Sequence, residues 1–271
     1  MPSQNTKRQR QKMGRHARQA ALLAARRRRA RRNRALVAGF LTLLLVLGVA
    51  TLVGGGNDST REETSNTTVP TEVSLPPVPP GATIEGDTPC PQADGSSPRT
   101  SKFAKPPPMC IDSNRTYTAE IRTNLGVITA ALDAKAAPQT VNNFVVLARY
   151  HYFDGISFHR IIPGFVIQGG DPELNGRGGP GYEFADELPQ AGQYKVGSLA
   201  MANSGPNTNG SQFFIVTGEQ GASLPPQYSL FGQVTSGLDV VQKIDAAGSP
   251  NSQEGKPTQV VTMESVTIKE G

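Results

Sequence analysis

An uncharged run of 19 residues, Ala35–Val53, limits what this chain can fold into more than any other feature of its sequence. At a rise of about 1.5 Å per residue, a helix of this length just crosses a hydrocarbon core of roughly 30 Å. A buried helix of a water-soluble domain would normally show a polar face, and this run has none. The run therefore predicts a single transmembrane helix that divides the 271-residue chain into two parts.

The charge differs sharply between the two parts. Residues 1–34 contain 13 Lys and Arg and no acidic residue, whereas the remaining residues contain 14 basic and 22 acidic ones. A basic flank on the N-terminal side of a span predicts a cytoplasmic N-terminus and an extracytoplasmic body at the cell membrane. The alternative is a cleaved signal peptide, with Gly48–Ala50 as the small-residue cleavage site.

The basic tail itself, residues 1–34, is open to two interpretations. In the first, it is a topology signal that also rests on anionic lipid headgroups. In the second, it is an arm for nucleic acid or the ribosome. We favour the first, because the adjacent span already accounts for the charge. The acidic body is a poor nucleic-acid partner, since such binding depends on clustered positive charge.

Residues 54–115 are predicted to form a disordered tether that holds the body away from the membrane. The segment opens with three glycines and contains 11 of the chain's 22 prolines, with no apolar periodicity. Cys90 and Cys110, the chain's two cysteines, lie within it. In an exported protein this spacing suggests a disulfide, and a pair of free thiols is the alternative.

Residues 116–271 have the pattern of a compact, mainly β domain. Short alternating runs separated by Gly and Pro predict strands, and two segments, 137–150 and 237–247, have the apolar stripe of a helix. The predicted strands are Tyr117–Thr123, Gly126–Leu132, Phe158–Ile162, Phe165–Gln168, Ser198–Met201, Phe213–Val216, Leu230–Val234 and Val260–Lys269. An antiparallel barrel or sandwich covered by helices is therefore expected. No exposed apolar stripe is left over, so we expect a monomeric domain.

Two segments concentrate the residues capable of chemistry. Phe158–Asp171 reads FHRIIPGFVIQGGD, and Leu199–Ile215 reads LAMANSGPNTNGSQFFI. Side-chain amides beside aromatic rings in a strand-loop-strand context predict a groove for peptide, because amides bind backbone groups and rings accept an apolar side chain. Three His and two Cys are too few for a multi-ligand metal cluster, so neither a metal nor a cofactor is expected.

These two segments, in this order, resemble the signature of the cyclophilins, the cyclosporin-binding type of peptidyl-prolyl isomerase. Phe184–Glu187 and Leu230–Gly232 are also similar, so the resemblance covers nearly all of residues 116–271. It implies a closed eight-stranded antiparallel β-barrel capped by two α-helices. It also implies cis–trans isomerisation of X–Pro bonds, which would assist the folding of exported proteins. The alternative is a non-catalytic peptide-binding or holdase module that uses the same groove.

The resemblance assigns catalysis to Arg160, Phe165 and Gln168. As an X–Pro bond twists, its nitrogen becomes pyramidal, and a fixed guanidinium that donates to it stabilises the twisted amide over both planar forms. The other positions that match the family's groove are His159, Val166, Ala202, Asn203, Gln212, Phe214, Leu224 and Tyr228. We interpret His159 as structural rather than as an acid or base, because the reaction transfers no proton.

Two positions depart from the best-known family members. Ser223 stands where many have a Trp that contacts cyclosporin, and Tyr228 stands where many have a His in the proline pocket. Tyrosine keeps that wall aromatic, so catalysis is expected to survive. The loss of the Trp predicts weakened binding of cyclosporin.

Overall fold

The computed structural model describes residues 73–271, except residues 251 and 253. The predicted tail, the predicted span and the first part of the predicted tether, residues 54–72, lie outside the described residues. Among the helices that are described, none is long and apolar enough to cross a membrane.

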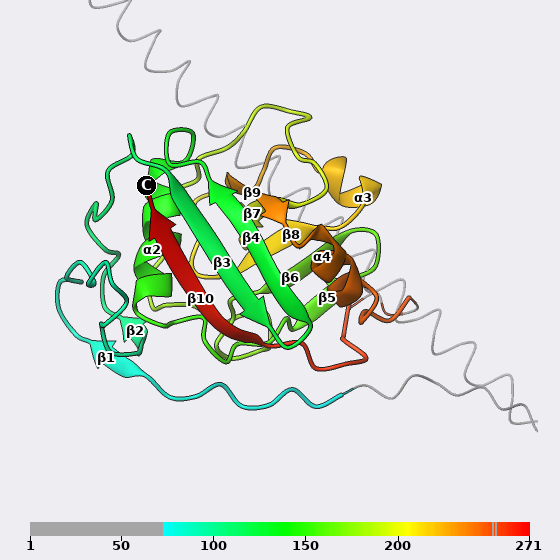
Figure 1. Ribbon diagram of the computed structural model, residues 1–271, viewed down its shortest axis with the longest axis horizontal. Coiled ribbons are helices and arrows are strands. Elements are labelled where there is room, and N and C mark those ends of the chain that lie inside the picture. Colours follow the sequence, from blue (N-terminus) through cyan, green and yellow to red (C-terminus); the bar gives the residue numbers. More distant parts are fainter. Residues whose placement is uncertain (1–72, 251, 253) are drawn as a thin grey trace, which may run out of the picture. The chain divides into compact units, whose positions relative to one another are not determined.

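Eight strands within the described residues form one antiparallel sheet (Figure 1). The strands are β3 (Tyr117–Thr123), β4 (Gly126–Leu132), β5 (Arg160–Ile162), β6 (Val166–Gly169), β7 (Ser198–Met201), β8 (Phe213–Val216), β9 (Leu230–Ser236) and β10 (Met263–Glu270). Their order across the sheet is β10-β3-β4-β9-β7-β8-β6-β5. All eight predicted strands are confirmed, four of them with the predicted bounds.

The prediction of a closed barrel is wrong. β5 and β10 stand at opposite ends of the strand order and share no ladder. One bridge, Ser157–Thr262, links the chain before β5 to the chain before β10. Further along β5, the N–H of Ile161 donates to the carbonyl oxygen of Gly255 at 2.7 Å. A loop therefore occupies the edge where β10 would have to pair, and the sheet is a curled half-barrel.

The two predicted helices are present as α2 (Pro138–Arg149) and α4 (Leu238–Asp245). A short helix that was not predicted, α3 (Glu219–Ala222), lies between β8 and β9 in the chain. The carboxylate of Glu187 accepts the N–H groups of Gln139 and Thr140 at 3.0 and 2.8 Å. It thereby satisfies two otherwise unpaired donors of the first turn of α2 and places negative charge at the positive end of the helix dipole.

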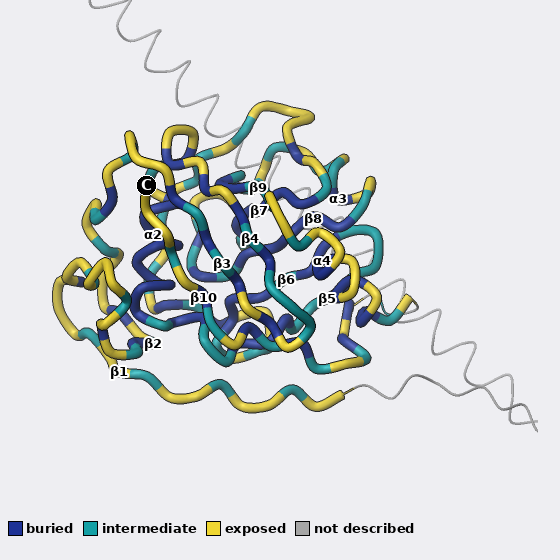
Figure 2. The backbone as a smooth tube through the Cα atoms, viewed as in Figure 1, coloured by how far each residue is buried: buried dark blue, intermediate teal, exposed yellow. Residues whose placement is uncertain are grey.

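Two apolar clusters lie on opposite faces of the central strands. Along β8, Phe213 and Ile215 point into the main core, whereas Phe214 and Val216 belong to a smaller cluster on the other face. β8 is consequently buried along its whole length (Figure 2). The smaller cluster continues into partly exposed residues, so it forms the floor of a surface site.

The prediction of a disordered tether is wrong for residues 81–112, which are built into the fold. Residues 81–112, which we call the strap, contain β1 (Ala82–Ile84) and β2 (Thr100–Phe103), a parallel pair. The strap lies beside the C-terminal end of α2, where the N–H of Thr100 donates to the carbonyl oxygen of Tyr150 at 2.9 Å. Composition misled the prediction because backbone and polar side-chain contacts, rather than a periodic apolar face, hold the strap.

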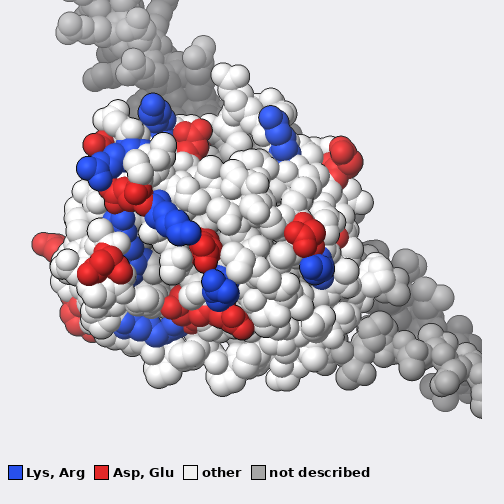
Figure 3. Space-filling view, viewed as in Figure 1, with Lys and Arg blue, Asp and Glu red and all other residues white. Residues whose placement is uncertain are grey.

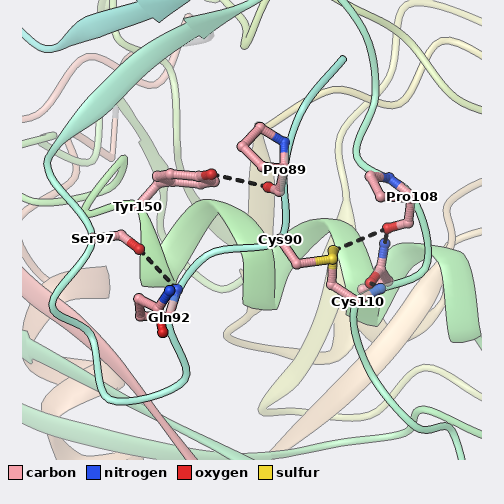
Figure 4. Close-up of a disulfide and its surroundings, with 8 residues drawn as sticks. Pro89, Cys90, Gln92, Ser97, Pro108, Cys110 and Tyr150 are labelled. Atoms are coloured by element: carbon pink, nitrogen blue, oxygen red, sulfur yellow. Dashed lines mark hydrogen bonds between the residues drawn. A yellow bond between two sulfur atoms is a disulfide. The ribbon is translucent and has the colours of Figure 1, made fainter.

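Polar anchors fix the strap at three further places. The guanidinium of Arg99 donates to the carbonyl oxygens of His151, Tyr152 and Asp154. Asn142 on α2 accepts the N–H of Cys110 at 2.7 Å and donates to the carbonyl oxygen of Pro108 at 2.9 Å. The suggested disulfide between Cys90 and Cys110 is present, and the hydroxyl of Tyr150 donates to the carbonyl oxygen of Pro89 beside it (Figure 4).

Charges of both signs are interspersed over the face that Figure 3 shows. Ion pairs link opposite charges at the surface of the described residues; Glu120 pairs with both Lys269 and Arg122 at 3.1 and 3.2 Å. This face therefore lacks the single-sign basic stripe that nucleic-acid binding requires.

Candidate functional site

Strand register places two of the three predicted catalytic residues, Arg160 and Gln168, in one row on the outer face of the sheet. Arg160 on β5 is directly paired with Gln168 on β6, Gln168 with Phe214 on β8, and Phe214 with Ala200 on β7. Residues paired across adjacent strands project their side chains to the same side. The register thus brings together side chains that lie up to 54 positions apart, from Arg160 to Phe214.

A chain of hydrogen bonds orients the polar members of the site. The guanidinium of Arg160 donates to Oε1 of Gln168 at 3.2 Å, and Nε2 of Gln168 donates to Oε1 of Gln212 at 3.0 Å. Nε2 of Gln212 then donates to the carbonyl oxygen of Gly178 at 2.9 Å. Because a guanidinium can only donate and a carbonyl can only accept, the two ends dictate the orientation of both amides.

The loop that supplies the last acceptor is wound around a buried carboxylate. Asp171 is fully buried and accepts the backbone N–H groups of Glu173, Asn175 and Gly176. A Cβ at position 178 would fall 2.0 Å from Oδ1 of Asp171, so only glycine allows this approach. Asp171 ends the first of the two segments that resemble the family, and no role was predicted for it. Its signal was the run of glycines around it.

Beside Arg160 lies a hollow of about 250 Å³. This size suits one side chain rather than a large ligand. The hollow is lined by nine residues, all of them predicted: Arg160, Phe165, Val166, Gln168, Ala202, Asn203, Phe214, Leu224 and Tyr228. Leu224 and Tyr228, on either side of Pro225 and Pro226, both line it as the resemblance implied.

Tyr194 supports the aromatic wall of this hollow through hydrogen bonds to the backbone of Tyr228. The Tyr228 ring meets the Phe214 ring edge-on, with centroids 5.4 Å apart. The hydroxyl of Tyr194 donates to the carbonyl oxygen of Tyr228 at 2.7 Å and accepts its N–H at 3.2 Å. Tyr194 was missed from the sequence, because nothing in its local pattern distinguishes it from a core tyrosine.

Arg160 enters the hollow as a partly desolvated cation. Its Cζ atom lies 6.0 Å from the centroid of the Phe165 ring. Burial lowers the pKa of Arg160, and the nearby Tyr228 opposes this shift, while a guanidinium remains protonated near neutral pH. Gln168 is its one hydrogen-bond partner among the described residues, so its other N–H groups are available to a bound peptide.

The remaining residues singled out in the sequence, Gln212, His159 and Ser223, do not line this hollow. Gln212 lines a second, larger hollow of about 720 Å³, which shares Gln168, Ala202 and Asn203 with the first. His159 lines neither hollow, and both of its ring nitrogens are buried without a partner in the described part of the chain. Burial lowers the pKa of His159, although Asp171 opposes that shift. The Ser223 hydroxyl donates back to the carbonyl oxygen of Glu219 in α3.

No cluster of three or more His, Cys, Asp or Glu side chains able to hold a metal ion occurs in the described ranges. The site offers one cation, amides and an apolar pocket. That equipment suits binding and distorting a peptide without covalent chemistry.

Comparison with known proteins identifies the fold that carries this site. The family described as cyclophilin type peptidyl-prolyl cis-trans isomerase/CLD matches residues 118–268. The probable peptidyl-prolyl cis-trans isomerase A of Mycobacterium leprae is 46% identical over 169 residues, which cover 56% of this chain and 91% of that protein. The probable isomerase B of Mycobacterium tuberculosis is 37% identical over 212 residues, 72% of this chain and 68% of that protein.

Solved structures agree with the sequence relatives. The crystal structure of a Cryptosporidium parvum cyclophilin type peptidyl-prolyl cis-trans isomerase, obtained in the presence of the dipeptide Ala-Pro, superposes with a TM-score of 0.52 at 32% identity. The superposition covers 57% of this chain and 99% of that one. The family match spans more than half of the chain and includes every residue of the row that begins at Arg160. The chain therefore belongs to the cyclophilin-type peptidyl-prolyl cis-trans isomerase family.

Proposed function

We propose that this chain accelerates rotation about X–Pro peptide bonds in exported proteins and thereby assists their folding. Uncatalysed rotation takes tens of seconds or longer, which is slow enough to limit folding. The observation that carries the proposal is Arg160, which lines a hollow of about 250 Å³ and has Gln168 as its one hydrogen-bond partner among the described residues.

The geometry supports separate roles for the hollow, which would bind the proline ring, and for the cation, which would act on the twisting bond. Phe165, Val166, Phe214 and Leu224 form an apolar pocket for the proline ring. Arg160 then lies where it can donate to the proline nitrogen as the amide twists. That contact strengthens only in the twisted state, so it lowers the barrier rather than merely tightening binding.

The backbone of Asn203 supports the binding of an extended peptide. Its N–H and C=O groups have no hydrogen-bond partner among the described residues, although the position borders both hollows. Its side chain is occupied, since Nδ2 donates to the carbonyl oxygen of Gln227 at 2.9 Å. The free backbone groups are therefore the ones offered to the backbone of a client.

Cis-to-trans exchange of a short X–Pro peptide tests this proposal, with Arg160→Ala and Arg122→Ala compared in the full-length chain. Removing a donor aimed at a transition state costs about 10²- to 10³-fold in rate, so Arg160→Ala is expected to lose most of the activity. Arg122 is the matched control, because it is an exposed arginine on β3 paired only with Glu120 among the described residues. If the wild-type chain binds the peptide but exchange is no faster than without protein, the non-catalytic holdase would be favoured.

We also propose that residues 35–53 anchor the chain in the cell membrane with its N-terminus cytoplasmic. The uncharged run and its basic flank support this placement. Extraction of membranes at alkaline pH is expected to leave the chain in the pellet, and protease added to intact cells is expected to remove residues 73–271. Release at alkaline pH, or protection from the protease, would refute the anchor or its orientation respectively.

A further inference from the structure

The strap places one aromatic side chain, Phe103, beneath the site. Phe103 is only 2% exposed and contacts three tyrosines. Its ring centroid lies 5.5 Å from that of Tyr150, 6.4 Å from that of Tyr152 and 6.2 Å from that of Tyr182. The strap lies outside residues 118–268, which match the family, yet it completes an aromatic cluster inside the domain.

Two of those tyrosines hold the segment that ends at Gln212. The hydroxyl of Tyr152 hydrogen-bonds the hydroxyl of Ser211 at 2.9 Å. The hydroxyl of Tyr182 donates to Oδ1 of Asn143 at 2.6 Å, and Nδ2 of Asn143 donates to the carbonyl oxygen of Gly210 at 2.9 Å. The two residues before Gln212 are thus both tied, directly or through one side chain, to rings that pack on Phe103.

A second contact joins the backbone of Phe103 to the loop that contains Gly178. The N–H of Phe103 donates to the carbonyl oxygen of Pro180 at 2.8 Å. The next residue, Gly181, has a φ of +107°, and a Cβ there would lie 2.5 Å from the carbonyl oxygen of Phe103. This close approach fixes the loop that contains Gly178, whose carbonyl oxygen accepts from Gln212. Phe103 therefore supports both the donor and the acceptor of that hydrogen bond.

We propose that the strap is part of the active-site scaffold and that Phe103 is a positioning residue for Gln212. By holding Gln212 in place, it fixes the orientation of the Gln168 amide. That amide in turn orients the guanidinium of Arg160. The neighbouring Lys102 lines the larger hollow, so the strap also forms part of the wall of the groove. The effect on rate rests on the proposed isomerase function, whereas the effect on geometry does not.

The test compares Phe103→Leu with Ile121→Val in the full-length chain in detergent micelles. Both changes shorten a fully buried apolar side chain, but Ile121 lies on β3, which carries no residue of the site. Displacing catalytic groups by a fraction of an ångström is costly, so Phe103→Leu is expected to lower kcat/KM about tenfold. Ile121→Val is expected to leave kcat/KM unchanged. Equal kcat/KM values for Phe103→Leu and the wild-type chain would overturn the proposal.

A double-mutant cycle separates positioning from general loosening of the fold. If Phe103 acts through Gln212, Phe103→Leu should cause almost no further loss in a Gln212→Ala background. If Phe103 serves only global stability, the two losses should multiply. If the losses of kcat/KM in the two single variants multiply in the double variant, the proposal is refuted, even when Phe103→Leu alone lowers kcat/KM.

The side-chain amide NMR signals of Gln168 and Gln212 provide a readout independent of turnover. We expect both signals to shift in Phe103→Leu and to remain in place in Ile121→Val. If the wild-type chain proves inactive, the proposed function fails, while shifted amide signals would still establish the positioning role. Unshifted signals in Phe103→Leu would overturn that role whatever the activity.

Discussion

Removal of the Cys90–Cys110 disulfide tests whether the strap folds together with the sheet. The perturbation is the double variant Cys90→Ser/Cys110→Ser, studied in a fragment covering residues 73–271. The disulfide links residues 20 positions apart. The chain-entropy relation for a closed loop of this length gives about 3 kcal/mol of stabilisation at 25 °C.

The contacts of the strap determine whether this loss of stability appears in global unfolding or only in local unfolding of the strap. Phe103 is packed in the main core, and Arg99 and Asn142 tie the strap to residues on and after α2. The strap should therefore unfold with the sheet rather than before it, so the whole loss should be seen in global unfolding. With a urea m-value of about 2–3 kcal/mol/M for a domain of this size, the midpoint should fall by roughly 1 M.

Urea unfolding followed by far-UV circular dichroism and tyrosine fluorescence provides the assay, since the chain contains no Trp. The two probes should give coincident transitions with an unchanged m-value in both proteins. An unchanged midpoint, together with early hydrogen exchange at the N–H groups of Thr100 and Phe103, would refute the reasoning. It would show that the strap detaches on its own and contributes nothing to the stability of the sheet.

Three other outcomes follow from single contacts. Gly181→Ala should destabilise the domain by about 1–3 kcal/mol, since both its φ of +107° and Phe103 oppose a Cβ, whereas Gly179→Ala, with nothing within 4 Å, should change the urea midpoint little. Arg149 and Arg115 hold the pKa of Glu270 below its usual value, so this carboxylate stabilises the fold above the ordinary glutamate pKa and loses that contribution as pH falls through the lowered one. Acid titration of unfolding free energies should therefore show a shallower decline in Glu270→Gln, and an identical decline would contradict this assignment. Tyr194→Phe removes both hydrogen bonds to the backbone of Tyr228, which should raise KM for an X–Pro peptide about fivefold with little change in kcat, at a cost near 1 kcal/mol.

The predictable part of the structure is the part in which local pattern and tertiary packing agree. Tyr117–Thr123 and Gly126–Leu132 have the predicted bounds, because strict alternation places one face of each strand in the core. The row from Arg160 to Phe214 could be named but not assembled, since strand pairing depends on register between distant segments.

The strap could not be predicted, because the contacts that stabilise it leave no periodic apolar pattern in the sequence. Only a few apolar side chains, such as Phe103 and Ile111, are buried in it, and they are separated by prolines and polar residues. Most of its other anchors involve backbone N–H and C=O groups, which nearly every residue possesses. The same reason hid the role of Gly178, whose backbone oxygen, rather than any side chain, ends the hydrogen-bond chain from Arg160.

The pairing of β3 with β10 imposes an order of events on biosynthesis. Tyr117 at the start of β3 is in register with Glu270 at the end of β10, 153 residues later in the chain. Until β10 has been synthesised, one edge of β3 has no partner, and the sheet is left with an exposed edge that invites pairing with other chains. Completion of the sheet must therefore follow translation of β10. The sheet thus reaches its full set of strands only after almost all of residues 73–271 has been made, and that late, non-local pairing is expected to slow its folding.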